Sequence, residues 1–412
     1  MARNSTLPDT DNIDTDLLIS GGGLAGMTMA IAAAGAGLRS VVVERMDPAA
    51  LTDTAFDGRC SAIAYASWRL FEATGIAPLI EEHQPILDIR VTDGDSPLFL
   101  HYDHRELGEG PFGQMVENRA IRKALFARAA EMDEITLLAP DGLIDTRFSA
   151  TGVQARTSGG RNIRARLCIA AEGRRSPLRE QAGISTFGWS YGQTGIVCTV
   201  AHEYPHHGVA IERFLPAGPF AILPLTGRRC SLVWTERNDF AAHIMGLDNA
   251  TFTLEMQRRF GDFLGRTEVI GPRWSYPLTL QLAERLCAER LVLIADAAHG
   301  IHPIAGQGLN LGLRDIAALA EVLTDAARLG LDIGSADTLA RYERWRRFDT
   351  LSMVAVTDGL TRLFSNDIAP LRLGRDLGLA AVNRMAELKK LFMRHARGTV
   401  GELPKLLAGQ PL

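Results

Sequence analysis

Short apolar runs and one long segment of small residues alternate over the first 45 residues, and their order predicts a strand, a helix and a second strand. Residues 17–19 form an apolar run typical of a buried parallel strand, and residues 41–43 form another. Between them, residues 27–36 are small and apolar, as expected for a helix that packs closely on a sheet. Three glycines with G-x-G-x-x-G spacing separate the first strand from the helix: Gly21, Gly23 and Gly26.

Each glycine has a physical role if this unit binds a dinucleotide. Gly21 permits the tight turn, Gly23 lets a pyrophosphate approach the backbone, and Gly26 lets helix and strand pack closely. The phosphates would sit on unpaired N–H groups at the positive end of the helix. Glu44, at the end of the second strand, is placed to accept a hydrogen bond from a ribose hydroxyl. The predicted cofactor-binding residues of this unit are Gly21, Gly23, Leu24, Ala25, Gly26, Glu44 and Arg45.

Between residues 62 and 169 the pattern mixes helical and strand-like segments. Apolar positions at helical spacing predict helices, and short apolar runs bounded by turn residues predict strands. The expected helices are 62–74 and 117–132, and the expected strands are 86–92, 98–102 and four short ones within 135–169.

From residue 190 to residue 282 the pattern changes to strand-like runs separated by Pro/Gly turns. This predicts an antiparallel sheet in a second structural unit, interrupted by one helix at 249–264. The strand-like runs are 196–200, 220–223 and 231–235.

A buried strand at 291–294 and a helix at 309–327 return to the first pattern, and the chain from 338 is helical with a break at 366–370. Dinucleotide-type segments therefore occur near the start, in the middle and near residue 290. We expect an α/β fold in which a discontinuous Rossmann-like domain contains an inserted antiparallel-sheet domain and is followed by helices. The predicted domains are 14–75, 115–189 and 284–330 for the nucleotide, 76–114 and 190–283 for the substrate, and 331–412 for the C-terminal helical region.

Composition narrows the class of protein. A chain of 412 residues with 46% hydrophobic and 22% charged residues is ordinary for a globular protein of more than one structural unit. The net charge of −4 argues against nucleic-acid binding. Residues 1–14 lack the apolar core of a signal peptide, and no apolar run is long enough to span a membrane. Five scattered cysteines indicate a reducing compartment, so we expect a cytoplasmic protein without a cysteine metal site.

A second constellation lies between residues 291 and 315, which read LVLIADAAHGIHPIAGQGLNLGLRD. The apolar strand delivers Asp296 to its carboxyl end, where open α/β sheets bind ligands and where it can accept a hydrogen bond from a ribityl hydroxyl. Gly306, Gly308 and Gly312 bring backbone amides close to a ligand at the start of the next helix. The helix dipole there would stabilise negative charge on a reduced flavin, typically by ~0.3–1 kcal/mol.

With these motifs in this order, the chain resembles the class A flavoprotein aromatic hydroxylases, which have the para-hydroxybenzoate hydroxylase fold. Within that family it is most similar to the ubiquinone-biosynthesis hydroxylases that act on polyprenyl phenols. The resemblance covers most of the chain and rests on the Gly21-to-Glu44 unit, on the middle motif Glu172-Gly173-Arg174-Arg175-Ser176, and on the segment from Ala295 to Gly312. Asp57-Gly58-Arg59 is similar to the family's flavin-contacting arginine motif, and Asn118 and Arg122 stand where polar residues often face the cofactor.

The chain departs from the family pattern at two positions. Glu172 replaces the usual aspartate of the middle motif, which makes the link of that motif to flavin and NAD(P)H less certain. Ala295 replaces a common glycine before Asp296, and we expect a slightly looser turn to absorb it.

The resemblance implies non-covalent FAD, NAD(P)H or a protein electron donor as reductant, and O₂ as co-substrate. In the family, a flavin hydroperoxide transfers oxygen to an electron-rich phenol, so the cofactor supplies the difficult chemistry. We therefore assign no acid or base residue, and no separate NAD(P)H domain or metal site is expected. The flavin-positioning loop is predicted to contain Pro303, Gly306, Gln307 and Gly308. The further cofactor-binding residues are Arg59, Asn118, Arg122, Glu172, Asp296, Gly308, Leu309 and Asn310.

Several interpretations stay open. The same motifs serve FAD monooxygenases of soluble aromatic compounds, and a non-catalytic FAD-binding member of a quinone-biosynthesis complex would also carry them. A flavin-dependent halogenase is disfavoured because its W-x-W-x-x-P element is missing. Arg59 could be a surface charge, and Asn118 could be a helix cap. His299 is expected to pack or hydrogen-bond beside the cofactor. The residues that either line a ring-binding pocket or fill the core are Phe214, Leu223, Pro224 and Trp234.

The C-terminal arm has a charge pattern of its own. Helical spacing over 381–395 places Ala381, Met385, Leu388 and Phe392 on one face, with Arg384, Lys389, Lys390 and Arg394 on the other. Residues 371–412 carry a net charge of about +5. Two interpretations remain: peripheral contact with the inner face of a membrane, or packing of this face on the FAD domain or a partner. We also expect a homo-oligomer, with other ubiquinone-biosynthesis proteins as candidate partners.

Overall fold

The computed structural model describes residues 12–53, 58–94, 96–108, 110–302, 306–364 and 369–412. Its first layer is a sheet with a parallel centre, which confirms the predicted strand–helix–strand unit. The central strand β1 (Asn12–Ser20) is flanked by parallel partners on both sides, as a doubly covered α/β sheet requires. The spatial order is β17 (Cys287–Ala288), β18 (Leu291–Leu293), β11 (Asn162–Ala170), β1, β2 (Ser40–Val43) and β8 (Ile135–Leu138), with β10 (Gly152–Thr157) and β9 (Leu143–Ser149) extending from β11.

Helices rich in small residues cover this sheet. α1 (Leu24–Ala34) is buried along most of its length and packs against both α4 (Asn118–Ala130) and α8 (Gln307–Arg328). Short alanine side chains let these backbones approach closely, and the resulting core joins the two flanking layers into one cluster. The helices predicted at 27–36, 117–132 and 309–327 are therefore confirmed, with bounds shifted by up to three residues.

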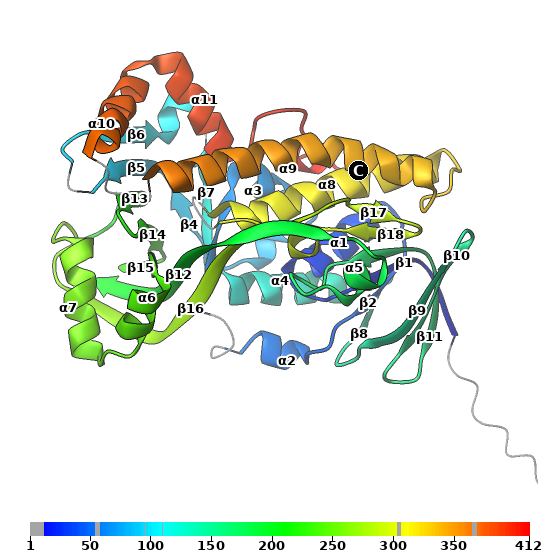
Figure 1. The fold of residues 1–412 in the computed structure, drawn as a ribbon. Helices are drawn as coiled ribbons and strands as arrows, with labels where there is room; N and C mark the ends of the chain where they lie inside the picture. The colour runs from blue at the N-terminus through cyan, green and yellow to red at the C-terminus, as the bar shows by residue number, and fades with distance from the viewer. Residues whose placement is uncertain (1–11, 54–57, 95, 109, 303–305, 365–368) are drawn as a thin grey trace, which may run out of the picture.

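The second layer is a mostly antiparallel sheet, as predicted for residues 190–282. Two 17-residue strands of this sheet, β12 (Thr186–His202) and β16 (Thr267–Ala283), extend beyond its other strands toward the parallel sheet (Figure 1). One parallel pair, β13 (Val209–Leu215) with β5 (Asp88–Asp93), departs from the antiparallel pattern. The spatial order is β19 (His299–Gly300), β16 (Thr267–Ala283), β12 (Thr186–His202), β15 (Arg229–Arg237), β14 (Gly218–Leu225), β13 (Val209–Leu215), β5 (Asp88–Asp93) and β6 (Phe99–Asp103).

Side chains of this sheet alternate between two faces. On β14 and β15, Phe220, Ile222 and Trp234 point to a core closed by the helices α6 (Asn238–Met245) and α7 (Asn249–Phe260). Figure 1 shows these two helices at the end of the molecule farthest from β9 and β10. The opposite face of the sheet turns toward the parallel sheet and borders the cavity described below.

Several elements were not predicted. β13, β16 and α6 were missed because Pro, Gly and charged residues interrupt their apolar patterns. The helix expected from residue 62 begins later: residues 60–64 form a strand, β3 (Cys60–Ala64), and α3 (Tyr65–Ala73) follows it. β3 pairs with β7 (Gly113–Glu117), which pairs with β4 (Gln84–Ile86), in a small third sheet. The shorter elements are α2 (Pro48–Leu51), α5 (Pro177–Gln181), η1 (Ala77–Leu79), η2 (His104–Leu107), η3 (Ala295–Ala297) and η5 (Lys405–Ala408). The domain boundaries stay a prediction.

The C-terminal region is helical, as predicted, and spans both layers. α9 (Ala336–Phe364) contacts α8 and β17 at one end and β14 at the other, and α10 (Ala369–Arg384) and α11 (Ala386–Arg397) close over β5 and β6 (Figure 1). Most of the expected break at 366–370 lies outside the described residues.

The predicted apolar face over 381–395 is wrong. The helix ends at Arg384 and restarts at Ala386, so the segment is not one helix. In α11 the buried positions are Lys389, Met393 and Arg397, whereas Phe392 is exposed. The buried Lys389 forms an ion pair of 2.6 Å with Glu106 instead of facing solvent.

Candidate active site

Three turns meet at one edge of the parallel sheet. β1, β11 and β18 are neighbouring parallel strands, so Ser20, Ala170 and Leu293 end side by side. After each strand the chain turns, and the three turns, which begin at Gly21, Ala171 and Ile294, contain the three sequence motifs. The carboxyl ends of parallel strands are where open α/β sheets bind ligands.

The glycine turn after β1 has the geometry that the sequence predicted. Gly21 has φ +102°, and a side chain there would lie 2.5 Å from the carbonyl oxygen of Ala171. A side chain at Gly26 would overlap the carbonyl oxygen of Gly21, which explains the tight packing of α1 on β1. At Gly23 a Cβ would meet nothing within 4 Å, and this residue lines a cavity. The residues present therefore fit a pyrophosphate at the start of α1.

A single cavity of about 1610 Å³ connects this edge with the free face of the antiparallel sheet. Most of the predicted site residues lie on its wall, although they come from five separate segments of the chain. Those on the wall are Gly23, Leu24, Ala25, Arg59, Asn118, Arg122, Asp296, Gly306, Gln307, Gly308, Leu309 and Asn310. The predicted site residues that do not line the cavity are Gly21, Gly26, Glu44, Arg45 and Glu172. Pro303 and Asp57 lie outside the described residues.

Two acidic residues that were predicted to bind the cofactor, Glu44 and Glu172, accept hydrogen bonds from other groups of the protein. Glu44 Oε2 accepts a hydrogen bond of 2.7 Å from the backbone N–H of Gly22, which ties β2 to the glycine turn. Glu172 accepts hydrogen bonds from Ser20 Oγ at 2.7 Å and from Ser176 Oγ at 2.5 Å. Both carboxylates thus hold the turns in place, and any contact of either with a cofactor stays a prediction.

The turn that presents Asp296 is strained rather than loose. Ala295 adopts φ +50°, the left-handed conformation that favours glycine, so the expectation of a looser turn is wrong. The Asp296 side chain is 56% exposed, lines the cavity and has a distant ion pair of 4.0 Å with Arg174. Its carboxylate is therefore available to a ligand hydroxyl.

Asn310 and Asn118 hold the walls of the cavity together. The Asn310 side chain accepts a hydrogen bond of 2.8 Å from Ala64 N and donates one of 2.8 Å to Ala62 O, which fixes the start of α8 against β3. Asn118 Oδ1 accepts a hydrogen bond of 2.6 Å from Ser61 Oγ. The N-cap of α4 is Glu117 and has no side-chain cap bond, so the interpretation of Asn118 as a helix cap is wrong.

Arg59 is not a plain surface charge. Its guanidinium lies 5.1 Å from the ring centroid of Tyr276, and both residues line the cavity. A planar guanidinium with several N–H donors suits the polar edge of a ring.

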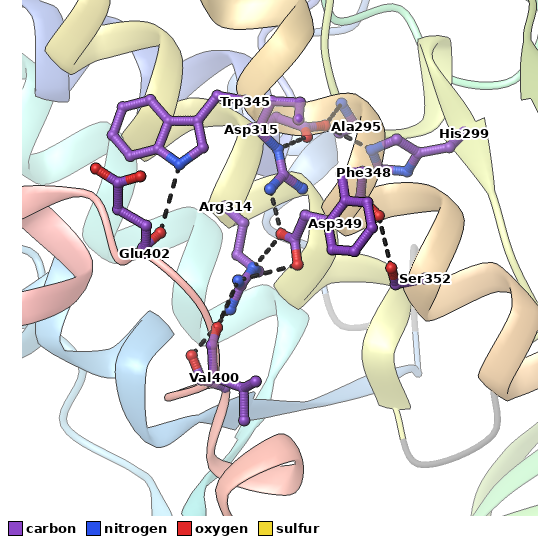
Figure 2. Close-up of polar contacts among 12 residues, drawn as sticks. Ala295, His299, Arg314, Asp315, Trp345, Phe348, Asp349, Ser352, Val400 and Glu402 are labelled. Carbon is purple, nitrogen blue, oxygen red and sulfur yellow. Dashed lines mark hydrogen bonds and ion pairs between the residues drawn. The ribbon is translucent and has the colours of Figure 1, made fainter.

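Buried charged side chains form a network of hydrogen bonds and ion pairs that holds the turn at Ala295 and Asp296 in place (Figure 2). Asp315, which is fully buried, accepts a hydrogen bond of 3.0 Å from Ala295 N and lies 2.6 Å from His299 Nε2. Arg346 Nε of α9 donates to the other oxygen of Asp315 at 2.7 Å and also pairs with Asp349.

The same network reaches the C-terminal tail. Arg314 Nε donates to Asp349 at 2.7 Å, and Arg314 also donates to the carbonyl oxygens of Gly398 and Val400 (Figure 2). Burial opposes the charge on Asp315, but His299 and Arg346 hold the pKa of this carboxyl below its usual value. The network therefore ties the Asp296 turn, α8, α9 and the tail into one unit.

This network was not predicted from the sequence. The only signal was a pair of charges, Arg314 and Asp315, inside an otherwise apolar helix. His299, expected to pack or hydrogen-bond beside the cofactor, is buried and bonded to Asp315. Within the described part of the chain, no three His, Cys, Asp or Glu side chains gather as a metal site.

The far wall of the cavity is apolar and comes from the antiparallel sheet. Of the residues with two interpretations, Phe214 and Leu223 line the cavity, whereas Pro224 does not and Trp234 is buried in the core on the other face. Among the described sheet residues on this wall, Glu212 alone carries a charge, and the sequence analysis missed it because β13 was not predicted.

Comparisons with known proteins agree with this arrangement. The family described as FAD binding domain matches residues 14–350. Ubiquinone hydroxylase UbiL of Rhodospirillum rubrum is 54% identical over 99% of this chain and 96% of its own. The 3-demethoxyubiquinol 3-hydroxylase of Escherichia coli is 33% identical over 94% of this chain and 99% of its own. The crystal structure of p-nitrophenol 4-monooxygenase PnpA from Pseudomonas putida has the same fold, with a TM-score of 0.79 and 18% identity over 95% of this chain and 100% of that chain.

The family match covers most of the chain and includes all three turns. It agrees with the glycine geometry, which leaves space for a pyrophosphate at Gly23, and with the ligand-facing Asp296. The protein is therefore a flavin monooxygenase with FAD as its cofactor, and the chain belongs to the FAD-dependent class A aromatic hydroxylases.

Proposed function

We propose that this protein hydroxylates the aromatic ring of a polyprenyl phenol in ubiquinone biosynthesis. The observation that carries the proposal is the single cavity, which joins a glycine-built edge suited to FAD with an apolar wall suited to a prenylated ring. A whole-length relative with 54% identity that is named a ubiquinone hydroxylase supports it.

FAD would lie along the three turns. The pyrophosphate would bind the backbone amides at Gly23, Leu24 and Ala25, where α1 begins. Asp296 would accept a hydrogen bond from the ribityl chain. The flavin ring would face the amides of Gly308 and Leu309 at the start of α8, where the helix dipole favours negative charge.

When bound and reduced, FAD activates O₂ and supplies an electrophilic oxygen atom. The residues of this chain have the tasks of binding the ring, orienting it and excluding water. The wall formed by the antiparallel sheet suits all three tasks, because its mostly apolar side chains would surround the ring and exclude water. NAD(P)H or a protein donor would deliver the electrons.

The substrate would enter from a bilayer. Phe348, Val356 and Leu363 of α9 and Phe392 of α11 line the cavity and are also exposed, Phe348 to 81%. Large apolar side chains exposed together are typical of membrane or ligand contact sites. Among the described residues no helix is long and apolar enough to cross a membrane, so the contact would be peripheral.

Turnover with substrate in vesicles tests the proposal. The FAD-loaded protein is given NADH or NADPH, O₂ and a prenylated phenol in anionic lipid vesicles, and the products are identified by mass spectrometry. We expect one added oxygen atom per ring, and co-sedimentation of the protein with the same vesicles.

Each alternative gives a different result in that assay. Hydroxylation of a soluble phenol but not of the prenylated one would favour a monooxygenase of soluble aromatics. No product with any phenol, despite full flavin occupancy and a supplied chemical reductant, would favour a non-catalytic FAD-binding protein. A protein that is active without co-sedimenting would separate the chemistry from the membrane contact.

A further inference from the structure

Among the described residues of the antiparallel sheet that line the cavity, Glu212 is the only carboxylate, and most of the side chains around it are apolar. Successive residues of β13 alternate between the two faces of the sheet, so Ala210, Glu212 and Phe214 face the cavity. The neighbour Arg213 faces away and donates to the backbone carbonyl of Arg259. The position of Glu212 is therefore fixed by the pleat of the strand.

The surroundings of Glu212 are apolar. Its directly opposite partners are Val91 on the parallel strand β5 and Ala221 on the antiparallel strand β14. Two residues further along β13, on the same face, the ring of Phe214 stacks on Phe364 of α9 with centroids 4.1 Å apart. Among the residues that the structure describes, none donates a hydrogen bond to the Glu212 carboxylate or forms an ion pair with it.

Glu212, which faces the cavity, thus differs from the buried carboxylates Asp93 and Asp315. Asp93, on the adjacent strand, is paired with Arg375 at 2.7 Å, and Asp315 has three donors. Burying a carboxylate without partners is unfavourable, so such groups are ordinarily paired. A carboxylate that faces a ligand cavity without a partner is expected to meet its donor on the ligand.

Burial alone raises the pKa of Glu212 to about 7. The group therefore changes charge near neutral pH, which suits a proton acceptor. Other titratable or charged groups that line the cavity or stand on the neighbouring strand β5 include Asp93, Tyr102, Tyr276, Arg59, Arg375 and His395.

We propose that Glu212 accepts the hydrogen bond, and then the proton, of the phenol hydroxyl of the substrate. The inference rests on the proposed function and adds to it the residue that recognises and activates the ring. A phenol is a moderate nucleophile, whereas its phenolate places more electron density on the ring carbons that attack an electrophilic oxygen.

The proton that Glu212 takes up is returned at the end of the reaction. The phenol O–H bond breaks, its electron pair stays on the phenolate oxygen, and the proton moves to Glu212. After oxygen transfer, the ring carbon loses its hydrogen as a proton to solvent and aromaticity returns. The carboxylic acid of Glu212 then returns its proton to the phenolate oxygen, so the residue ends as it began.

Glu212→Gln tests the proposal with little change of shape, and Glu268→Gln, an exposed carboxylate on β16 of the same sheet, is the matched control. Wild-type kcat is expected to rise with pH, with a midpoint near 7, as Glu212 loses its proton. Glu212→Gln should lower kcat about 100-fold or more and remove that rise, since a positioned base contributes 10²–10⁴-fold. Glu268→Gln should retain both.

Equilibrium binding gives a readout that does not depend on turnover. The oxidised FAD-loaded protein is titrated at pH 8 with a short-chain prenylated phenol and with its methyl ether, which has no O–H to donate. We expect the wild type to bind the phenol about tenfold more tightly than the ether. Glu212→Leu should lose this preference and should bind the ether at least as tightly as the wild type does.

The possible outcomes separate the two proposals. If the wild type hydroxylates the prenylated phenol but Glu212→Gln keeps its rate and pH profile, and Glu212→Leu keeps the preference for phenol, the role of Glu212 is refuted and the function stands. If the wild type neither binds nor hydroxylates the phenol, both proposals are overturned.

Discussion

The two ends of the cavity are built from different parts of the chain. At the glycine edge, the cavity is bordered by backbone: Gly23 and Gly308 each leave open space where a side chain would stand. At the sheet end, the wall consists of alternating side chains, with Glu212 between Val91 and Ala221. The first end suits a large polar cofactor whose phosphates need amide donors, and the second suits a ring and its apolar tail.

This difference predicts how each end tolerates mutation. Where glycine backbone borders the cavity, ligand binding depends on the lack of side chains at a few positions, so a single added Cβ is harmful there. Where side chains form the wall, ligand binding depends on their total volume and on the Glu212 carboxylate. Substitutions of the apolar residues that conserve volume should therefore be tolerated. The experiments below test the glycine edge and the network behind it, in order of decreasing effect.

The largest effect is expected from Gly23→Val. A Cβ at Gly23 meets no protein atom within 4 Å, and the backbone there, with φ −73°, is allowed for valine. The variant should therefore fold with nearly the thermal midpoint of the wild-type apoprotein. It should lose FAD, with at least a 100-fold weaker affinity in a fluorescence titration, because the side chain would occupy the space of the pyrophosphate.

Gly35→Ala is a suitable control for this variant. Gly35 has φ −59° and only ordinary contacts of 3.6 Å, so the added methyl should leave both folding and flavin content unchanged. A Gly23→Val protein that retains full FAD would show that the cofactor does not pass this turn.

An effect on stability rather than on flavin occupancy is expected from Asp315→Asn. The substitution leaves Arg346 buried without one of its two counter-ions, and such losses cost about 3–5 kcal/mol. Urea unfolding of the apoprotein measures the change. Asp296→Ala, which removes an exposed carboxylate, should leave the unfolding free energy nearly unchanged and weaken FAD about tenfold.

The pH dependence of the unfolding free energy is expected to differ between the variants at Asp315 and at Asp296. The folded-state pKa of Asp315 lies below the unfolded value of about 3.9. Its contribution is therefore complete above that value and is lost as the pH falls through the folded pKa. Wild type and Asp296→Ala should lose stability steeply below about pH 4, and Asp315→Asn less steeply. Parallel curves for all three proteins would contradict the assignment.

Sequence alone could predict the glycine edge and much of the fold. Backbone geometry restricts Gly21 and Gly26 to one residue type, so spacing reveals them, and the apolar runs of β1, β2 and β18 are unbroken. The sheet wall could not be predicted in this way. Its carboxylate, Glu212, lies on a strand interrupted by charges, and part of its environment comes from β5, which is distant in sequence. The network of Asp315 and Arg346 likewise joins helices whose packing no local pattern specifies.

The smallest effect concerns the turn before Asp296, where the sequence suggested a loose backbone and the structure has a strained one. Ala295 has φ +50°, which costs an alanine about 1–2 kcal/mol. Ala295→Gly removes this cost but adds about 0.5–1 kcal/mol of backbone entropy and loses a buried methyl worth about 0.8 kcal/mol. The net change in unfolding free energy should therefore be within about 1 kcal/mol of zero.

Ala298→Gly, three residues later, provides the comparison that isolates the strain. Ala298 is also buried but has φ −91°, so the same substitution there adds the entropy cost and removes the methyl group without relieving any strain. It should destabilise the protein by about 1.3–1.8 kcal/mol, from the same entropy and methyl contributions. The difference between the two variants in urea unfolding measures the strain at Ala295. Equal losses would mean that the turn stores none, and that the alanine before Asp296 is accommodated at no cost.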